Sequence, residues 1–189
     1  QPDLQKQTDK RSFRLHRTPP AFSDQCNLPS DRLYPLRPAK DPMSFLRVMT
    51  LNIWSQQGPW PRRKELLVAE LQTQAADVVA LQEVLSFTPV PAPGLDAPPP
   101  PFPTQADELR ADLYPYSAFA PACPVDARRT LGNALLSRFP IVQQSAVPLP
   151  NAVGPGHEPR VLLCALLELT QGLLPVFVTH LDWQLHLSH

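Results

Sequence analysis

Residues 48–54, VMTLNIW, place an asparagine inside a short run that otherwise has the pattern of a buried strand. Polar and apolar residues alternate there with a period of two, which is typical of a strand with one face in a core. An unpaired buried amide costs about 1–3 kcal/mol. The pattern therefore predicts that Asn52 has a partner elsewhere in the chain.

The residues around this run alternate between strand and helix patterns. A strand over 45–54 is followed by helical spacing over 62–76, with Pro61 suited to the first turn, and then by the short apolar strand VVALQEV at 78–84. This order predicts a βαβ-like unit. Further along, Thr104 and Asp107 form a capping box for a helix through about Leu113.

The rest of the chain changes to consecutive strands. The apolar pattern predicts them at 116–120, 130–137, 141–147, 161–169 and 174–180. Alternating elements followed by consecutive strands indicate a mixed α/β sheet instead of a doubly wound parallel one.

Composition limits the function classes that the chain can serve. Its 189 residues are 43% hydrophobic, and 17 basic residues balance 17 acidic ones, so no overall field draws the chain to nucleic acid or an anionic membrane. The widely spaced Cys26, Cys123 and Cys164 suggest reduced thiols instead of a disulfide framework. We find neither a transmembrane segment nor a signal peptide pattern, and take a cytoplasmic location as the default.

Proline is concentrated outside the predicted elements, with 26 residues in all. Residues 1–43 lack periodicity and are predicted to be a disordered or loosely docked tail, with Met43 a candidate start of the domain at 44–189. The Pro-rich loop at 86–103 is incompatible with a helix or central strand. It is either a stiff insertion between elements or a ligand for an SH3- or WW-type module.

Three polar residues share one context, the end of a predicted strand. Asn52 lies at the first strand, Glu83 at the second and His180 at the last. Ligands in α/β folds tend to bind where strand ends and loops converge. A carboxylate, an amide and an imidazole in one cleft suit a divalent metal and a phosphate.

The segments LRVMTLNIW, VVALQEV, GNALLSRFPI and VFVTHLDW resemble, in order and spacing, the endonuclease/exonuclease/phosphatase superfamily. The resemblance implies part of a four-layer α/β sandwich with a mixed, mostly antiparallel β-sheet. It also implies a Mg²⁺-dependent phosphoester hydrolase of the phosphodiesterase, nuclease or phosphatase type, for which Mn²⁺ is an alternative ion. By resemblance Glu83 and Asn52 are at the metal, His180 hydrogen-bonds the phosphate, and Asp182 orients His180.

The same resemblance puts Gly132 and Asn133 on a strand near the cleft and makes Arg138 a candidate phosphate contact. The family's later Gly-Asp-x-Asn and Ser-Asp-His motifs do not occur in the sequence, so we expect 44–189 to be a C-terminally truncated domain. In the family those motifs supply the general base, so the sequence does not identify the general base of this chain. An alternative is a non-catalytic interaction protein that uses a half-domain and the Pro-rich loop.

The sequence leaves several alternatives open. The substrate is a phosphoester, with nucleic acid, phospholipid and inositol phosphate not distinguished. Trp54 and Trp60 either stack on a ligand or, as we expect, pack in the core. His186 and His189 are either terminal solvated residues or part of a zinc site. Exposed apolar strand faces predict poor solubility or self-association.

Overall fold

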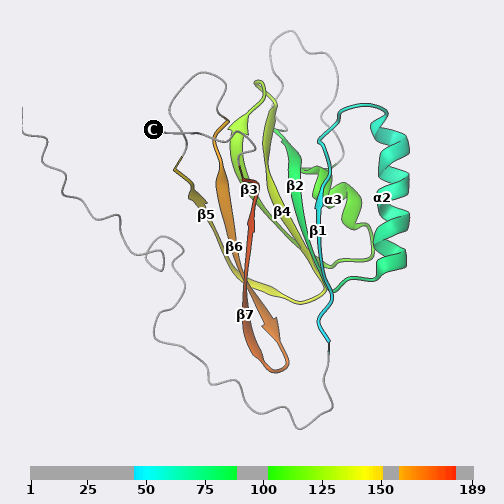
Figure 1. The fold of residues 1–189 in the computed structure, drawn as a ribbon, viewed down its shortest axis with the longest axis vertical. Helices are drawn as coiled ribbons and strands as arrows, with labels where there is room; N and C mark the ends of the chain where they lie inside the picture. The colour runs from blue at the N-terminus through cyan, green and yellow to red at the C-terminus, as the bar shows by residue number, and fades with distance from the viewer. Residues whose placement is uncertain (1–44, 89–101, 151–157, 182–189) are drawn as a thin grey trace, which may run out of the picture.

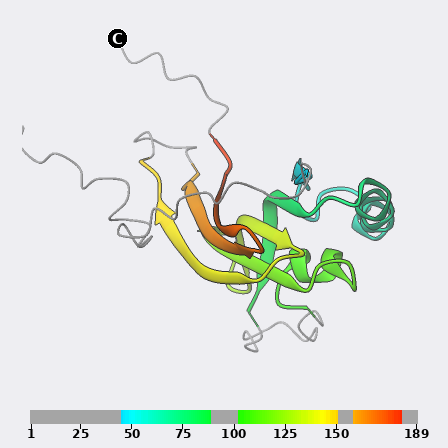
Figure 2. The same ribbon diagram turned by 90° about the horizontal axis from the view of Figure 1, so that it is seen from below.

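The computed structural model describes residues 45–88, 102–150 and 158–181 (Figure 1). These residues form three layers: a pair of helices, a four-stranded sheet and a three-stranded sheet. Figure 2 shows the helices on one side of the larger sheet and the smaller sheet on the other. None of the described helices has the length and apolar character needed to cross a membrane.

The larger sheet has the strand order β1-β2-β4-β3. Its first pair, β1 and β2, is parallel, and the helix α2 connects the two strands, while the other pairs are antiparallel. The elements are β1 (Val48–Asn52), α2 (Trp60–Gln74), β2 (Val78–Phe87), β3 (Tyr116–Pro124) and β4 (Arg129–Ser137).

The smaller sheet is an antiparallel meander of three strands in the order β5-β6-β7. Its elements are β5 (Ile141–Pro148), β6 (Val161–Leu169) and β7 (Gly172–Thr179). β6, the central strand, is buried along Val161–Leu167. Alternate residues from Val161 to Leu167 pack on the larger sheet, while Leu162 and Cys164 form a separate cluster with Val147.

The central strands β2 and β4 of the larger sheet are largely buried on both faces. On one face Val79, Leu81 and Leu136 pack against Leu71 of α2 and Leu109 of the short helix α3 (Gln105–Arg110). On the other face a second cluster joins the two sheets through Val78, Leu135, Leu163, Leu167 and Val178. A strand buried on both faces needs apolar residues without alternation, which explains the continuous run in β2.

Much of the predicted order is confirmed. The mixed, mostly antiparallel sheet and the βαβ unit are present, and Pro61 lies in the first turn of α2. The Thr104 hydroxyl accepts a hydrogen bond from the Asp107 backbone N–H at 3.0 Å, as the capping box predicts. Three layers of the expected four-layer sandwich lie within the described residues.

Some predicted boundaries were wrong. α3 ends at Arg110 instead of near Leu113, and β1 is shorter than the predicted 45–54. β2 continues through Phe87, paired with β4, so Ser86 and Phe87 belong to the sheet and not to the Pro-rich loop. Residues 89–101 of that loop and the predicted tail at 1–43 lie outside the described residues.

Candidate functional site

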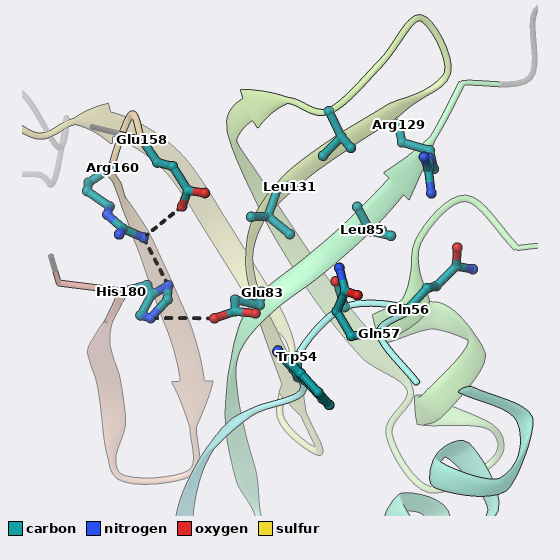
Figure 3. Close-up of a pocket in the computed structure, with 12 residues that line it drawn as sticks. Trp54, Gln56, Gln57, Glu83, Leu85, Arg129, Leu131, Glu158, Arg160 and His180 are labelled. Carbon is teal, nitrogen blue, oxygen red and sulfur yellow. Dashed lines mark hydrogen bonds and ion pairs between the residues drawn. The ribbon is translucent and has the colours of Figure 1, made fainter. Parts of the chain in front are cut away.

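Glu83 lies in a β-bulge inside β2. The pairing of β2 with β4 shifts register between Leu81 and Val84, and Glu83 has a φ of +55°, which L-residues rarely adopt. A bulge re-aims a side chain relative to the regular pleat. The strand does not end at Glu83, as the sequence suggested; the bulge within it turns the carboxylate toward the pocket (Figure 3).

Asn52, the last residue of β1, is exposed, so the expectation of a buried amide was wrong, but the amide has a partner as predicted. Its amide Nδ2 donates a hydrogen bond to Glu83 Oε1 at 2.8 Å, and its Oδ1 accepts one from the Trp54 backbone N–H at 2.8 Å. Both ends of the amide are therefore used. Asn52 fixes the Glu83 carboxylate on one side and the turn after β1 on the other.

His180 directly follows β7 and faces the same carboxylate (Figure 3). Its Nε2 lies 3.9 Å from Glu83 Oε1, and its Nδ1 lies 3.1 Å from Nη1 of Arg160. Glu83 and His180 are partly exposed, with 23% and 29% of their side-chain surfaces accessible, so both can reach a ligand.

Arg160 was missed by the sequence analysis. Its side chain is 11% exposed, and Nη1 lies 3.6 Å from Oε2 of Glu158, whose own side chain is 58% exposed. Arg160 immediately precedes β6, and His180 follows β7, which pairs with β6; their meeting depends on that pairing. The one local signal is the placement of a Glu-Pro-Arg segment directly before a strand that is apolar from Val161 through Leu167.

Two further side chains that the sequence analysis missed hold the turn after β1. Gln105 is fully buried; its Nε2 donates to the Ser55 carbonyl at 3.1 Å and its Oε1 accepts from the Leu85 N–H at 2.9 Å. Arg63 of α2 donates to the carbonyls of Ile53 and Gln57. These contacts tie the turn to both helices and to β2 beside the bulge.

A pocket of about 560 Å³ opens at this place (Figure 3). Its wall combines the charged group around Glu83 with an apolar floor, and a second arginine lies on the far side. The lining residues are Trp54, Ser55, Gln56, Gln57, Glu83, Leu85, Val125, Arg129, Leu131, Glu158, Arg160 and His180. Within the described residues, the chain therefore presents two carboxylates, one imidazole and two guanidinium groups to a single small volume.

Other candidates have different positions. Arg138 lies at the opposite end of β4, next to Ser137, which pairs with Val78, and its guanidinium is 3.7 Å from Asp77. Arg138 is therefore not among the residues that line this pocket. Asn133 is buried and donates to the Val161 carbonyl at 2.9 Å, which links the two sheets.

Gly132 is on β4, as expected, and its role is close packing. A Cβ at this position would lie 2.1 Å from the Ala120 carbonyl oxygen. Trp60 is buried, as predicted, whereas Trp54 is 57% exposed, so the expectation of core packing was wrong for Trp54. The remaining candidates, Asp182, His186 and His189, lie outside the described residues.

The donors fit a hard divalent cation that keeps most of its water. Mg²⁺ is commonly held by one or two carboxylates, with waters and substrate phosphates completing its shell. Glu83 supplies one carboxylate, steadied by Asn52. Among the described residues no group of three or more His, Cys, Asp and Glu side chains could hold an ion alone. The site thus suits a cation shared with a bound phosphate better than a structural metal.

The fold is an α/β sandwich with a charged pocket lined by Glu83 and His180. The sequence model of the Endonuclease/Exonuclease/phosphatase family matches residues 49–184. The chain belongs to that family. Family members are usually hydrolases and generally use divalent metal ions. No match to the chain was found among curated proteins.

Solved structures with a similar fold are found as well. An endonuclease/exonuclease/phosphatase from Beutenbergia cavernae is 30% identical with a TM-score of 0.55, and the match covers 72% of this chain and 38% of that one. A family protein from Leptotrichia buccalis is 15% identical, with a TM-score of 0.56 and coverages of 73% and 55%.

The catalytic domain of human Nocturnin, solved with a bound sulfate anion, is 20% identical, with a TM-score of 0.50 and coverages of 75% and 51%. The Leptotrichia and human structures show likeness of fold alone. The chain spans between 38% and 55% of the length of these three proteins.

Proposed function

We infer that the chain carries the metal-binding and phosphate-binding side of a Mg²⁺-dependent phosphoester hydrolase, of the phosphodiesterase, nuclease or phosphatase type. The observation that carries this proposal is the convergence on Glu83 Oε1, which lies 2.8 Å from Asn52 Nδ2 and 3.9 Å from His180 Nε2. Glu83 and His180 both line the pocket of about 560 Å³.

In this proposal each side chain has a separate task. Glu83 holds Mg²⁺, with Mn²⁺ as a substitute, and Asn52 keeps the carboxylate in one orientation. The bound ion would neutralise charge on the phosphoryl group. His180 donates a hydrogen bond to a phosphoryl oxygen, whose charge grows toward the transition state. Asp182 remains a proposed orienter of His180.

The water-activating base is not assigned to a described residue. Of the carboxylates in the described part of the chain, Glu83 and Glu158 line the pocket. A positioned general base contributes about 10²–10⁴-fold to a reaction of this kind.

The test is Mg²⁺-dependent hydrolysis of a generic aryl phosphodiester by the 189-residue chain and by Glu83→Gln. Glu65→Gln is the matched control, because Glu65 is 66% exposed and pairs with Arg62 on the surface of α2. We expect activity in the wild type and in Glu65→Gln and none in Glu83→Gln. Equal rates for all three, or a folded wild type without activity, would contradict the proposal and favour a non-catalytic interaction role.

A further inference from the structure

Arg160 is the most buried charged residue at the pocket, and the proposed function assigns it no role. Its side chain is 11% exposed, and its Nη1 is directed at the ring of His180 (Figure 3). The neighbouring Glu158 is largely exposed and 3.6 Å away, so it is a weak ion-pair partner. The closer contact, at 3.1 Å, is the one to His180 Nδ1.

The chemistry of that contact fixes the direction of the hydrogen bond. A guanidinium carries only donors and stays protonated in proteins. His180 Nδ1 must therefore accept, which requires a bare lone pair on Nδ1. An imidazole with a bare Nδ1 carries its proton on Nε2. The contact thus selects one of the two neutral tautomers.

The other ring nitrogen then faces the site as a donor. His180 Nε2 is 3.9 Å from Glu83 Oε1, which is too long for a hydrogen bond. The Nε2–H is therefore directed toward the carboxylate without being bonded to it. A phosphoryl oxygen placed beside Glu83 can accept this hydrogen.

We propose that Arg160 is the positioning residue of His180: its Nη1–H holds Nδ1 bare and presents Nε2–H to a phosphoryl oxygen. This deepens the proposed function, since it rests on the phosphate-binding role of His180. Partners of this kind, acting one shell away from the reacting atoms, typically change affinity or activity by about 10–100-fold.

The test is the tautomer of His180, read from long-range ¹H–¹⁵N correlations of the imidazole ring at about pH 9, where an ordinary imidazole is neutral. The chain has five histidines, so a His180→Gln spectrum assigns the signals. We expect the wild type to have a protonated Nε2 and a bare Nδ1. A protonated Nδ1 in the wild type would overturn the proposal without any arginine variant.

Arg160→Met removes the donor, and Arg129→Met is the matched control, because Arg129 lines the same pocket but pairs with Asp126 at 2.7 Å. We expect the Nδ1 resonance to move to the position of an unbonded nitrogen in Arg160→Met and to stay in Arg129→Met. Arg160→Lys, which keeps a charged donor, should restore part of the wild-type shift. Arg160→Leu, which also lacks the donor, serves if Arg160→Met does not fold. An unchanged Nδ1 resonance in folded Arg160→Met or Arg160→Leu would refute the proposal.

Kinetics separate this proposal from the proposed function. If the chain hydrolyses a phosphodiester, Arg160→Met should lower kcat by about 10–100-fold with a smaller change in KM, because alignment of the donor is lost. An unchanged kcat with an altered tautomer signal would contradict a positioning role in catalysis. If the wild type shows no hydrolysis, the proposed function fails, while the ring signals still decide whether Arg160 fixes the tautomer.

Discussion

Glu83 adopts a backbone conformation that is energetically unfavourable for any residue with a side chain. Its φ of +55° is in the left-handed region, where a non-glycine residue is strained by about 1–2 kcal/mol. Strain of this kind persists at functional sites because the surrounding structure holds it in place. Here Ser55 N–H bonds the Glu83 carbonyl at 3.0 Å and Asn52 bonds its side chain.

Two variants of Glu83 separate the effect of backbone strain from the loss of the carboxylate. Glu83→Ala and Glu83→Gly both remove the carboxylate, but only glycine adopts positive φ without cost. We expect Glu83→Gly to be more stable than Glu83→Ala by about 1 kcal/mol in the free energy of unfolding, measured by urea denaturation. If the alanine variant were the more stable, the positive φ would not be a source of strain.

Cys123 lies in β3 beside the pocket residues Glu158 and Arg160. Burial raises the pKa of its thiol, the Glu158 carboxylate raises it further, and Arg160 lowers it. A raised pKa means less thiolate at a given pH, so alkylation is slower than for an ordinary cysteine and keeps rising at higher pH.

The measurement is the rate of iodoacetamide labelling between about pH 7 and pH 10 in a Cys26→Ser background, with buried Cys164 as a slow internal reference. Glu158→Gln should speed labelling of Cys123, because it removes a negative charge that opposes the thiolate. Glu65→Gln should leave the rate unchanged. Labelling of Cys123 at the rate of an unhindered thiol near pH 7 would contradict the raised pKa.

Sequence reasoning located Asn52 and His180 because strand ends are local features of the apolar pattern, and Glu83 because its charge interrupts an apolar run. It could not locate the bulge, since the positive φ at Glu83 is imposed by pairing with β4, about 50 residues further along the chain. Arg160 was missed for a similar reason. Its partner is 20 residues away and meets it only because β6 pairs with β7.

For helices and strands, the sequence pattern predicted the structure correctly where the deciding residues lie close together in the chain. Thr104 caps α3 through a contact three residues away, and β6 has the predicted bounds Val161–Leu169 because its apolar run is unbroken. Boundaries that depend on distant partners were less accurate. β2 extends to Phe87 because β4 continues to pair with it beyond the bulge.

A substitution of Gln105 tests how α3 supports the site. Gln105→Leu would leave the Ser55 carbonyl and the Leu85 N–H without their side-chain partner. A buried unsatisfied group costs about 1–3 kcal/mol, so we expect a loss of that order in the free energy of unfolding from urea denaturation.

Gln74→Leu is the matched control for this measurement, because Gln74 is exposed on α2 and bonds Glu70 of its own helix. It should change the free energy of unfolding by about 0.5 kcal/mol or less. If Gln105→Leu were no worse than Gln74→Leu, the buried amide would not be holding the turn after β1.

The smaller sheet has exposed apolar side chains on its edge strands. Phe177 of β7 is 43% exposed. Val142 of β5 is 50% exposed, and the edge strands β5 and β7 are each paired on one side within the described residues. Open apolar edges and faces favour association.

We therefore expect concentration-dependent self-association of the 189-residue chain in light scattering. Phe177→Lys should shift the population toward monomer, because a charge on an exposed sheet face disfavours pairing. Thr73→Lys, an exposed change on α2, is the control. A monodisperse wild-type monomer at all concentrations would contradict the expectation.

The central claim is that Glu83 is a metal ligand, and calorimetric titration with Mg²⁺ tests it most directly. The samples are the wild type, Glu83→Ala and the surface control Glu65→Ala, each shown to be folded by its thermal transition. We predict binding to the wild type and Glu65→Ala, and none to Glu83→Ala. Equal Mg²⁺ binding by Glu83→Ala, or no binding by the folded wild type, would contradict the account.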